Sequence, residues 1–177
     1  MTKNWYVLST KLKQEKKIAA ILTKRGIENY CPYTNVERFY GTKSVVENQP
    51  LFNRYVFAAL SAEDILSLRD NPYEIDLVYW LSSPAVINKE EVEAIKIMTE
   101  NYINIRVEKA PINLGGQVDV SEESTTDYGN KLLSIRYQGI AITLPSLGYK
   151  LVAERQENSS FSSESKNIFG NLLLKSA

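Results

Sequence analysis

Few side chains in this sequence are suited to catalysis. The 177 residues include no histidine, which is the commonest general base and metal ligand, and a single cysteine, Cys31, which excludes an internal disulfide. Carboxylates that could perform acid–base chemistry in pairs are Asp64 with Asp70, and Glu90 with Glu91. No phosphate-cradling glycine loop or set of metal ligands accompanies them. We therefore expect a protein that is not an enzyme and that holds no cofactor and no metal.

Basic side chains near the N-terminus point to a different chemistry, the attraction of phosphate groups. Residues 1–54 carry ten lysines and arginines against four glutamates, a net charge of +6 in a chain whose formal net charge is zero. Flexible lysines attract a nucleic-acid backbone without reading its sequence. A solvated face of a lysine-rich helix would give the same pattern, and both interpretations stay open. The candidate nucleic-acid contacts are Lys11, Lys13, Lys16, Lys17 and Arg54.

Aromatic side chains provide a second group of candidates. Alternation along a strand sends Tyr55 and Phe57 to one side, opposite Val56, where they are either core residues or anchors of a binding surface. A second set lies in a predicted hairpin beside Arg38, where aromatic rings either pack together or stack on exposed bases. This second set is Tyr33, Phe39 and Tyr40.

Hydrophobic periodicity predicts the elements that position these side chains. The run at 55–60 is uniformly apolar, which indicates a central strand, and Asn88-Lys89-Glu90-Glu91 is a capping box that starts a helix. The expected strands cover residues 5–10, 36–40, 44–47, 55–60 and 75–81. The expected helices cover residues 13–25, 61–69 and the segment after Asn88. This order favours a mostly antiparallel sheet with helices packed on it.

The helical pattern ends near residue 103. Residues 104–112 are expected to form a linker, and residues 113–153 a small β-barrel with strands at 117–120, 131–137, 140–144 and 149–152. The serine-rich, polar residues 154–177 are expected to be disordered. No apolar run is long enough to span a bilayer, and no apolar signal segment opens the chain, so we expect a cytoplasmic protein with no membrane partner.

Several segments resemble those of a known family. Residues 50–57, PLFNRYVF, resemble the P-L-F-P-x-Y-V-F segment of NusG-like transcription factors, with Asn53-Arg54 in place of the common Pro-Gly. The run WYVL at 5–8 is similar to the family's first strand, and Glu15 falls on its first helix. The stretch at 26–32 resembles its G-I-x-x-Y-x-P pattern. With Ser83-Pro84-Ala85-Val86-Ile87 before the capped helix, the resemblance extends over residues 4–102.

The resemblance implies a fold and a task. The fold is α+β: residues 1–103 would form an N-terminal α/β sandwich with a mostly antiparallel sheet, and residues 113–153 a divergent SH3-like barrel of the KOW type. The task would be transcription elongation or antitermination on bacterial RNA polymerase, next to upstream or non-template DNA. The C-terminal domain would recruit partners such as the ribosome or the termination machinery. The most similar subgroup is the RfaH-type antiterminators of capsule and other polysaccharide operons.

The resemblance also implies a binding site. The family lines an apolar cleft for the polymerase clamp helices with the start of the strand that holds Phe52, Tyr55 and Phe57. By position, the other wall of the cleft would hold Trp80, Val92 and Ile95.

An alternative function is a stand-alone RNA-binding module without a polymerase partner. A helix-backed sheet with exposed aromatic rings can bind single strands, although the aromatic–glycine signature of RRM sheets is absent. RNA binding without polymerase would favour this alternative.

Overall fold

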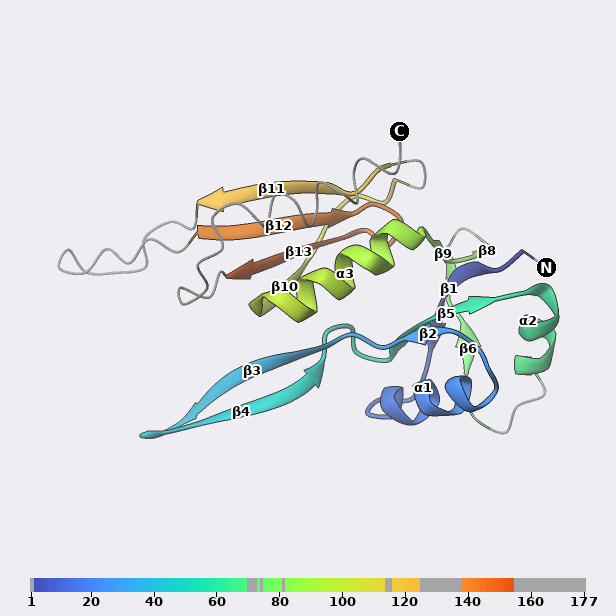
Figure 1. Cartoon of the computed structure of the whole chain (residues 1–177), viewed down its shortest axis with the longest axis horizontal. Coiled ribbons are helices and arrows are strands. Elements are labelled where there is room, and N and C mark those ends of the chain that lie inside the picture. Colours follow the sequence, from blue (N-terminus) through green and yellow to red (C-terminus); the bar gives the residue numbers. More distant parts are fainter. Residues whose placement is uncertain are drawn as a thin grey trace.

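The computed structural model of the chain describes residues 2–69, 73, 75–80, 82–113, 116–124 and 138–154 (Figure 1). These residues form an α+β structure with two antiparallel sheets. The first sheet has α1 and α2 on one face. On its other face lie α3 and the second sheet, as the membership of the two hydrophobic clusters shows.

The first sheet is five-stranded and antiparallel. Its strands follow the order β2-β5-β1-β6, and β9 also pairs with β1. The bounds are β1 (Asn4–Ser9), β2 (Asn29–Tyr30), β5 (Tyr55–Leu60), β6 (Asp76–Leu77) and β9 (Val86–Ile87). The prediction that residues 55–60 form a central strand is confirmed, because β5 pairs with β1 on one side and β2 on the other.

Both faces of the β1–β5 pair are buried. Val56, Ala58 and Leu60 face α1 and α2, whereas Phe57 and Ala59 face α3. Successive side chains of a strand point to opposite faces, so burial on both sides requires an unbroken apolar run. This explains the sequence YVFAAL at residues 55–60.

Helix α1 (Glu15–Lys24) buries Ile18 and Leu22 against the sheet. The helix begins later than the predicted residue 13, because Lys13 has a positive φ of 64° and so cannot belong to a right-handed helix. At its end, Gly26 adopts a φ of 71°, and the amide of Ile27 donates to the carbonyl of Leu22 at 3.0 Å.

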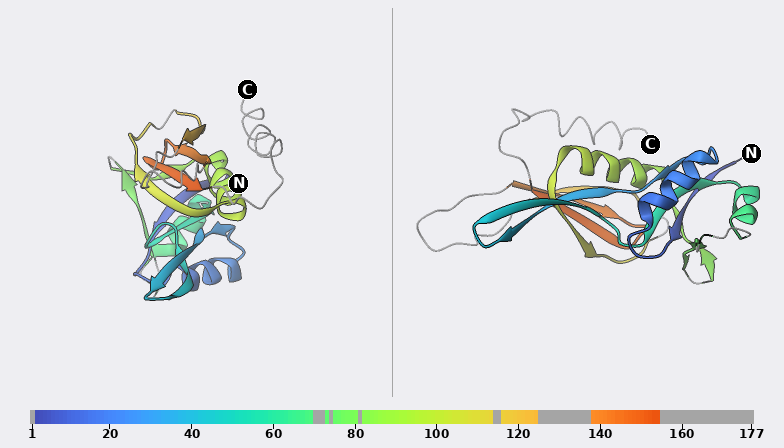
Figure 2. Two further views of the ribbon diagram at one scale, coloured as in Figure 1. Left: turned by 90° about the vertical axis from the view of Figure 1, so that its left-hand side faces the viewer. Right: turned by 90° about the horizontal axis from the view of Figure 1, so that it is seen from below.

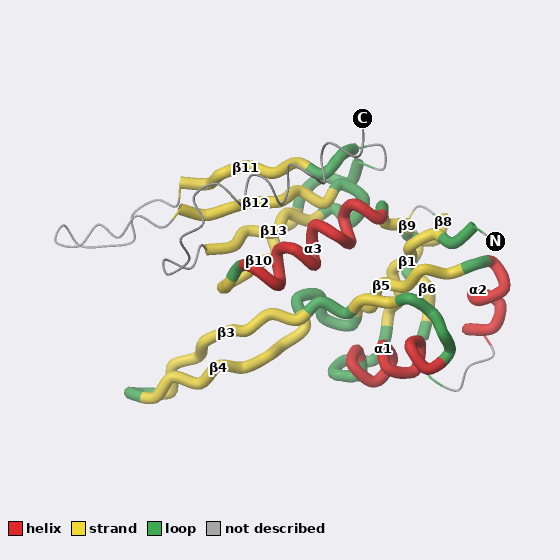
Figure 3. Tube along the Cα trace, viewed as in Figure 1, coloured by secondary structure: helices red, strands yellow, loops and turns green. Residues whose placement is uncertain are grey.

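Strands β3 (Tyr33–Tyr40) and β4 (Lys43–Pro50) form the predicted hairpin, which is longer than expected at both ends. Figure 3 shows it as a two-stranded ribbon that extends from the first sheet. Gly41, with a φ of 65°, and Thr42 make the tight turn. Strand β3 also lies beside β10 (Ile103–Lys109) of the second sheet.

The prediction of a single strand at residues 75–81 is wrong. Within this stretch, β6 pairs with β1, whereas β7 (Tyr79–Trp80) pairs with β8 (Ser83–Pro84) in a small hairpin of its own. The reason is that β9 occupies the same edge of β1, opposite Trp5 and Tyr6, so the chain must leave that edge after Val78. The predicted helix at 61–69 is confirmed as α2 (Ala62–Arg69).

Helix α3 (Lys89–Asn101) starts with the predicted capping box. The Glu91 carboxylate accepts a hydrogen bond from the amide of Asn88 at 3.0 Å and, with its other oxygen, one from the amide of Ser146 at 2.8 Å. Burial raises the pKa of the Glu91 carboxyl, and these hydrogen bonds oppose that rise. Glu91 therefore fastens the turn before β13 (Tyr149–Glu154) to the start of α3.

The second sheet is four-stranded, with the order β10-β13-β12-β11. Its remaining strands are β11 (Asp119–Ser124) and β12 (Gln138–Leu144). Residues 103–109, most of which were expected in the linker at 104–112, form β10, where Ile105 is buried and Val107 is half-buried on one face. The strand predicted at 131–137 and the tail from residue 155 lie outside the described residues.

The second sheet shares its core with the first. Ile142, Leu144 and Leu151 of the second sheet belong to the same buried cluster as Phe57 of β5 and Ile95 of α3. Figure 2 shows the second sheet and α3 adjoining each other along their length. Burial of this shared apolar cluster away from water keeps the two sheets together.

Replacing Glu91 with alanine should weaken the contact between α3 and the second sheet. Two backbone amides would lose a charged acceptor, so we expect the free energy of unfolding to fall by about 2 kcal/mol, measured by urea denaturation. Glu90→Ala, an exposed change in the same helical turn, is the control and should have little effect. Equal stability of the two variants would contradict the role given to Glu91.

Candidate functional site

The structure brings together most of the aromatic and apolar residues predicted to line a cleft. Phe52, Phe57, Val92 and Ile95 are buried in one cluster, and Tyr55 and Trp80 pack against its margin. The rings of Phe52 and Phe57 meet edge to face, with centroids 5.7 Å apart. The two expected walls, β5 and α3, therefore lie against each other across this cluster, called here the β5–α3 surface.

The second sheet covers the β5–α3 surface. The Phe52 side chain is only 5% exposed, and the ring centroid of Tyr149, on β13, lies 5.6 Å from its own. Tyr55 is half-buried beside Tyr149, and burial raises the pKa of its hydroxyl. In this arrangement Phe52 and Phe57 are core residues, and Tyr55 is the member of the aromatic group that solvent reaches.

The predicted basic contacts occupy one end of the first sheet. Lys11, Lys13, Lys16, Lys17 and Arg54 are all exposed. Arg54 comes from a different part of the sequence, but its backbone carbonyl accepts from the amide of Thr10 at 2.8 Å. Its guanidinium Nε donates to the carbonyl of Thr10 at 3.3 Å. Arg54 is thus held beside the turn that carries Lys11 and Lys13.

A buried carboxylate supports this end of the sheet. Glu15 is fully buried, and its Oε1 accepts from the amide of Arg54 at 2.8 Å, while Oε2 has no hydrogen-bond partner among the described residues. Arg54 has a positive φ of 68°, a conformation in which a glycine would be unstrained. The hydrogen bond to Glu15 helps to hold Arg54 in this conformation.

Two of the lysines are held over aromatic rings. The Lys16 ammonium lies 4.2 Å from the centroid of Tyr33, and the Lys17 ammonium 5.4 Å from that of Tyr73. Lys16 also donates to the side-chain oxygen of Asn48 at 3.1 Å. Of the other hairpin aromatics, Tyr40 is 58% exposed, and the side chain of Phe39 lies outside the described structure.

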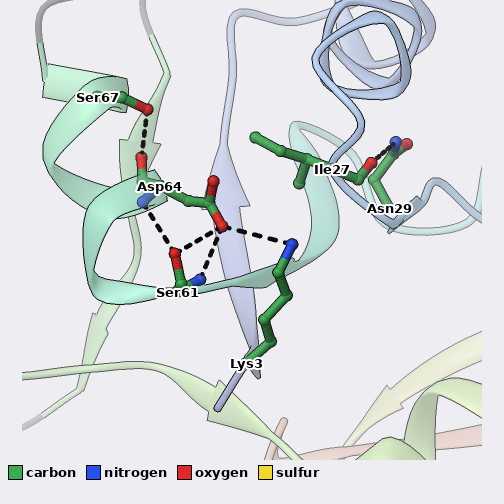
Figure 4. A network of polar contacts seen from close by, with 6 residues as sticks. All are labelled: Lys3, Ile27, Asn29, Ser61, Asp64 and Ser67. Atoms are coloured by element: carbon green, nitrogen blue, oxygen red, sulfur yellow. Dashed lines mark hydrogen bonds and ion pairs between the residues drawn. The ribbon is translucent and has the colours of Figure 1, made fainter. Parts of the chain in front are cut away.

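Two of the carboxylates considered for catalysis, Asp64 and Glu91, take part in helix N-terminal capping. Asp64 accepts from the amide and the hydroxyl of Ser61, both at 2.9 Å, and these hydrogen bonds lower the pKa of its carboxyl (Figure 4). Lys3 lies 3.6 Å from the same carboxylate. Glu91 is the N3 residue of the capping box of α3, whose N-cap is Asn88. Glu90 is exposed, and Asp70 lies outside the described residues.

Sequence reasoning missed three residues of this region. Tyr149 covers Phe52, and Asn35 and Asn48 extend the contacts of Lys16 along the hairpin. The hairpin register, once extended to residues 33 and 50, would have placed Asn35 opposite Asn48. No pattern in the sequence marks Tyr149 as a cover for Phe52.

Among the described residues, no group of three metal-ligating side chains gathers, and no helix has the length and apolar character needed to cross a membrane. The described residues thus combine an antiparallel sheet that has helices on both faces, a cationic end and a largely buried aromatic cluster. The profile of the family described as "NusG: Transcription termination factor nusG" matches residues 3–96. The chain belongs to the NusG family. Its members are non-enzymatic transcription factors, which confirms the expectation that this protein is not an enzyme. No curated protein matches the chain.

The thiol of Cys31 should react slowly in the native protein. Burial and the negative charge of Glu15 raise its pKa from 9.0 to about 11, so the reactive thiolate at pH 8 should be roughly a hundredfold scarcer than in a free thiol. We expect iodoacetamide to modify Cys31 at least that much more slowly in the native protein than in urea, as followed by mass spectrometry. Similar rates in the two conditions would contradict the buried position of this side chain.

Proposed function

We propose that this NusG-family protein is a transcription elongation and antitermination factor that binds the clamp helices of bacterial RNA polymerase through the β5–α3 surface. The observation that carries the proposal is the union of Phe52, Phe57, Val92 and Ile95 in one apolar cluster, with Tyr55 at its margin. Binding of a helix in an apolar groove depends on a few aromatic anchors of this kind. Such a factor would act in the cytoplasm, and the RfaH-type antiterminators of polysaccharide operons are the subgroup we favour.

Binding through this surface requires the second sheet to move away. Phe52 has little exposed area while Tyr149 lies against it. The hydrogen bonds from Ser146 to Glu91 and from Asn88 to Ser146 hold the sheet at the start of α3. We infer that polymerase competes with the second sheet for the same apolar residues, so its affinity for the closed protein is reduced by the cost of opening.

The second sheet is also the counterpart, in our proposal, of the family's KOW domain. Residues 113–153 supply three of its strands, and β10 adds a fourth from the chain just after α3. Closure into an SH3-like barrel and contacts with the ribosome or the termination machinery form part of the proposal. A sheet released from the β5–α3 surface would expose Leu144 and Leu151, which are buried in the shared core, to such a partner.

The cationic end of the first sheet is proposed to contact upstream or non-template DNA. Lysines from α1 and its preceding turn lie there together with Arg54, all exposed. Their contribution is electrostatic attraction to phosphates, which positions the duplex or strand without reading its sequence. Tight RNA binding in the absence of polymerase would instead favour the stand-alone RNA-binding module.

Loss of the aromatic anchors should weaken polymerase binding. If Phe52 and Tyr55 are hot spots, Phe52→Ala and Tyr55→Ala should each cost about 2 kcal/mol, roughly thirty-fold in the Kd for a clamp-helix fragment measured by calorimetry. Tyr149→Ala should have the opposite effect and tighten binding, since it removes a ring that covers Phe52.

The control for this experiment is Tyr40→Ala, which removes an exposed aromatic ring on the hairpin. It should leave the affinity for the fragment unchanged. Unchanged affinity in Phe52→Ala and Tyr55→Ala, with a lowered Tm, would make these side chains purely structural. If Phe52 and Tyr55 were purely structural, Tyr149→Ala would not tighten binding.

Neutralising the α1 lysines should change how nucleic-acid binding depends on salt. In the variant Lys13→Gln, Lys16→Gln, Lys17→Gln, fewer counterions are released, so the slope of log K against log salt concentration should become shallower by up to about 2 for a single strand. Fluorescence anisotropy with a labelled DNA strand measures this slope. Lys43→Gln, at the far tip of the hairpin, is the matched control. A slope identical to that of the unmodified protein would leave these lysines as solvated surface groups.

A further inference from the structure

Strand β4 forms an open edge of the hairpin. Among the described strands it pairs with β3 alone, whereas β3 also lies beside β10. Val45 and Val46, in the middle of β4, are 46% and 64% exposed. Figure 3 shows the hairpin as a ribbon that extends away from the first sheet. A two-stranded ribbon is only marginally stable in water, so a further strand on this edge would stabilise the hairpin.

This edge lacks most of the features that keep exposed strands from pairing. The register of β3 with β4 is continuous from the turn to Pro50, with no bulge. Pro50 is the last residue of β4 and its only proline. Bulges, prolines and charges are the usual means by which a protein protects an edge from a further strand. The charges that β4 carries, on Lys43 and Glu47, therefore decide which strand can pair with it.

The turn of the hairpin determines which backbone groups of β4 face outward. In a two-residue turn the flanking residues, here Tyr40 and Lys43, are bonded to each other. From Lys43 onward, every second residue of β4 then directs its N–H and C=O groups toward β3. The residues between them, Ser44, Val46 and Asn48, direct these groups toward the open edge. An added strand must place its own outward-directed residues opposite these three.

We propose that the open edge of β4 binds the same edge of a second copy of this chain, in an antiparallel pair with its two-fold axis at Val45. In this register Ser44 lies opposite Val46 of the second copy, as the outward backbone groups require. Lys43 lies opposite Glu47 of the second copy, and the symmetry repeats this ion pair on the other side of the axis. The proposal goes beyond polymerase and DNA binding and depends on neither.

Charge selects this register among those that the backbone allows. An axis at Ser44 or Val46 would place both charges of β4 opposite neutral residues. An axis at Lys43 or Glu47 would place two like charges directly opposite each other, which destabilises a strand pair. Only the axis at Val45 brings each lysine opposite a glutamate.

The Glu47 carboxylate is already held in position for this contact. Arg38 Nε lies 3.2 Å from one of its oxygens, and the hydroxyl of Tyr40 donates to the other at 3.2 Å. A carboxylate accepts further hydrogen bonds, so an exposed Lys43 from the second copy can bind it without displacing these contacts. At the axis, the two Val45 side chains share one face and bury apolar area against each other.

The size of this contact predicts a weak dimer. Only a few residues of each copy take part, so the interface is smaller than the roughly 1,200 Å² of a stable complex. Self-association should therefore depend strongly on protein concentration.

The first test exchanges the two charges of β4 in the full chain. Sedimentation velocity, over roughly a hundred-fold range of concentration up to the sub-millimolar Kd of a weak complex, should show the mass rising from one chain toward two. Lys43→Glu and Glu47→Lys should each weaken association about ten-fold, because each places two like-charged pairs across the axis. An equimolar mixture of the two variants should restore association, since every exchanged charge then faces an opposite one.

The second test locates the axis by a disulfide cross-link. The two Val45 Cα atoms should lie about 4.5 Å apart, within the range of a disulfide, so Val45→Cys should form a linked dimer under mild oxidation, seen on a non-reducing gel. Val46→Cys is the matched control, since this position is more exposed but lies more than about 7 Å from its counterpart in the second copy. Cys31 is present in both variants.

Several outcomes would overturn the proposal. These are a monomer at every concentration, self-association that neither charge change weakens, and a mixture of the two charge variants that does not associate. Cross-linking of Val46→Cys as fast as that of Val45→Cys would do the same. None of these measurements contains polymerase or DNA, so their result is separate from those of the clamp-helix and salt-dependence experiments.

Discussion

The antiparallel ladder between β1 and β5 must be covered on both faces, and most of the structure follows from this requirement. One face takes α1 and α2 through Leu8, Val56 and Leu60. The other presents Val7 and Phe57, which α3 covers only in part, and the second sheet completes the burial. An isolated first sheet would leave an apolar surface of the kind that marks an interaction site. Under the proposed function, the closed arrangement and polymerase binding would be two uses of the same hydrophobic face.

Two buried carboxylates join segments that hydrophobic packing alone would leave loose. Glu15 binds the amide of Arg54, and Glu91 binds the amides of Asn88 and Ser146. Charged acceptors make stronger hydrogen bonds to backbone amides than neutral ones do, and this compensates part of the cost of burying them. Each carboxylate lies at the start of a helix, so that α1 positions the cationic end of the sheet and α3 positions the cover of the β5–α3 surface.

The sequence predicts those parts of the fold whose signals are local. Uniform apolarity marks β5, Asn88 with Glu91 marks the start of α3, and Gly26 and Gly41 mark a helix end and a turn. The errors occur where distant contacts decide: β10 forms because β13 pairs with it, and the stretch at 75–81 divides because β9 occupies part of the same edge. For the site, residue types identify the aromatic and basic groups. The burial of these groups could not be predicted from the sequence, because Phe52 is covered by Tyr149, which is distant in the sequence.

The pairing of β10 with β13 also sets an order of events during synthesis on the ribosome. Helix α3 and the aromatic residues of β5 emerge first, and β10 follows directly, but its hydrogen-bonding partner is the last described strand of the chain. Until β13 has left the exit tunnel, α3 and β5 lack the part of their apolar cover that the second sheet provides. A nascent chain would therefore pass through an open stage with exposed apolar surface, to which a chaperone or another nascent chain could bind before the second sheet forms.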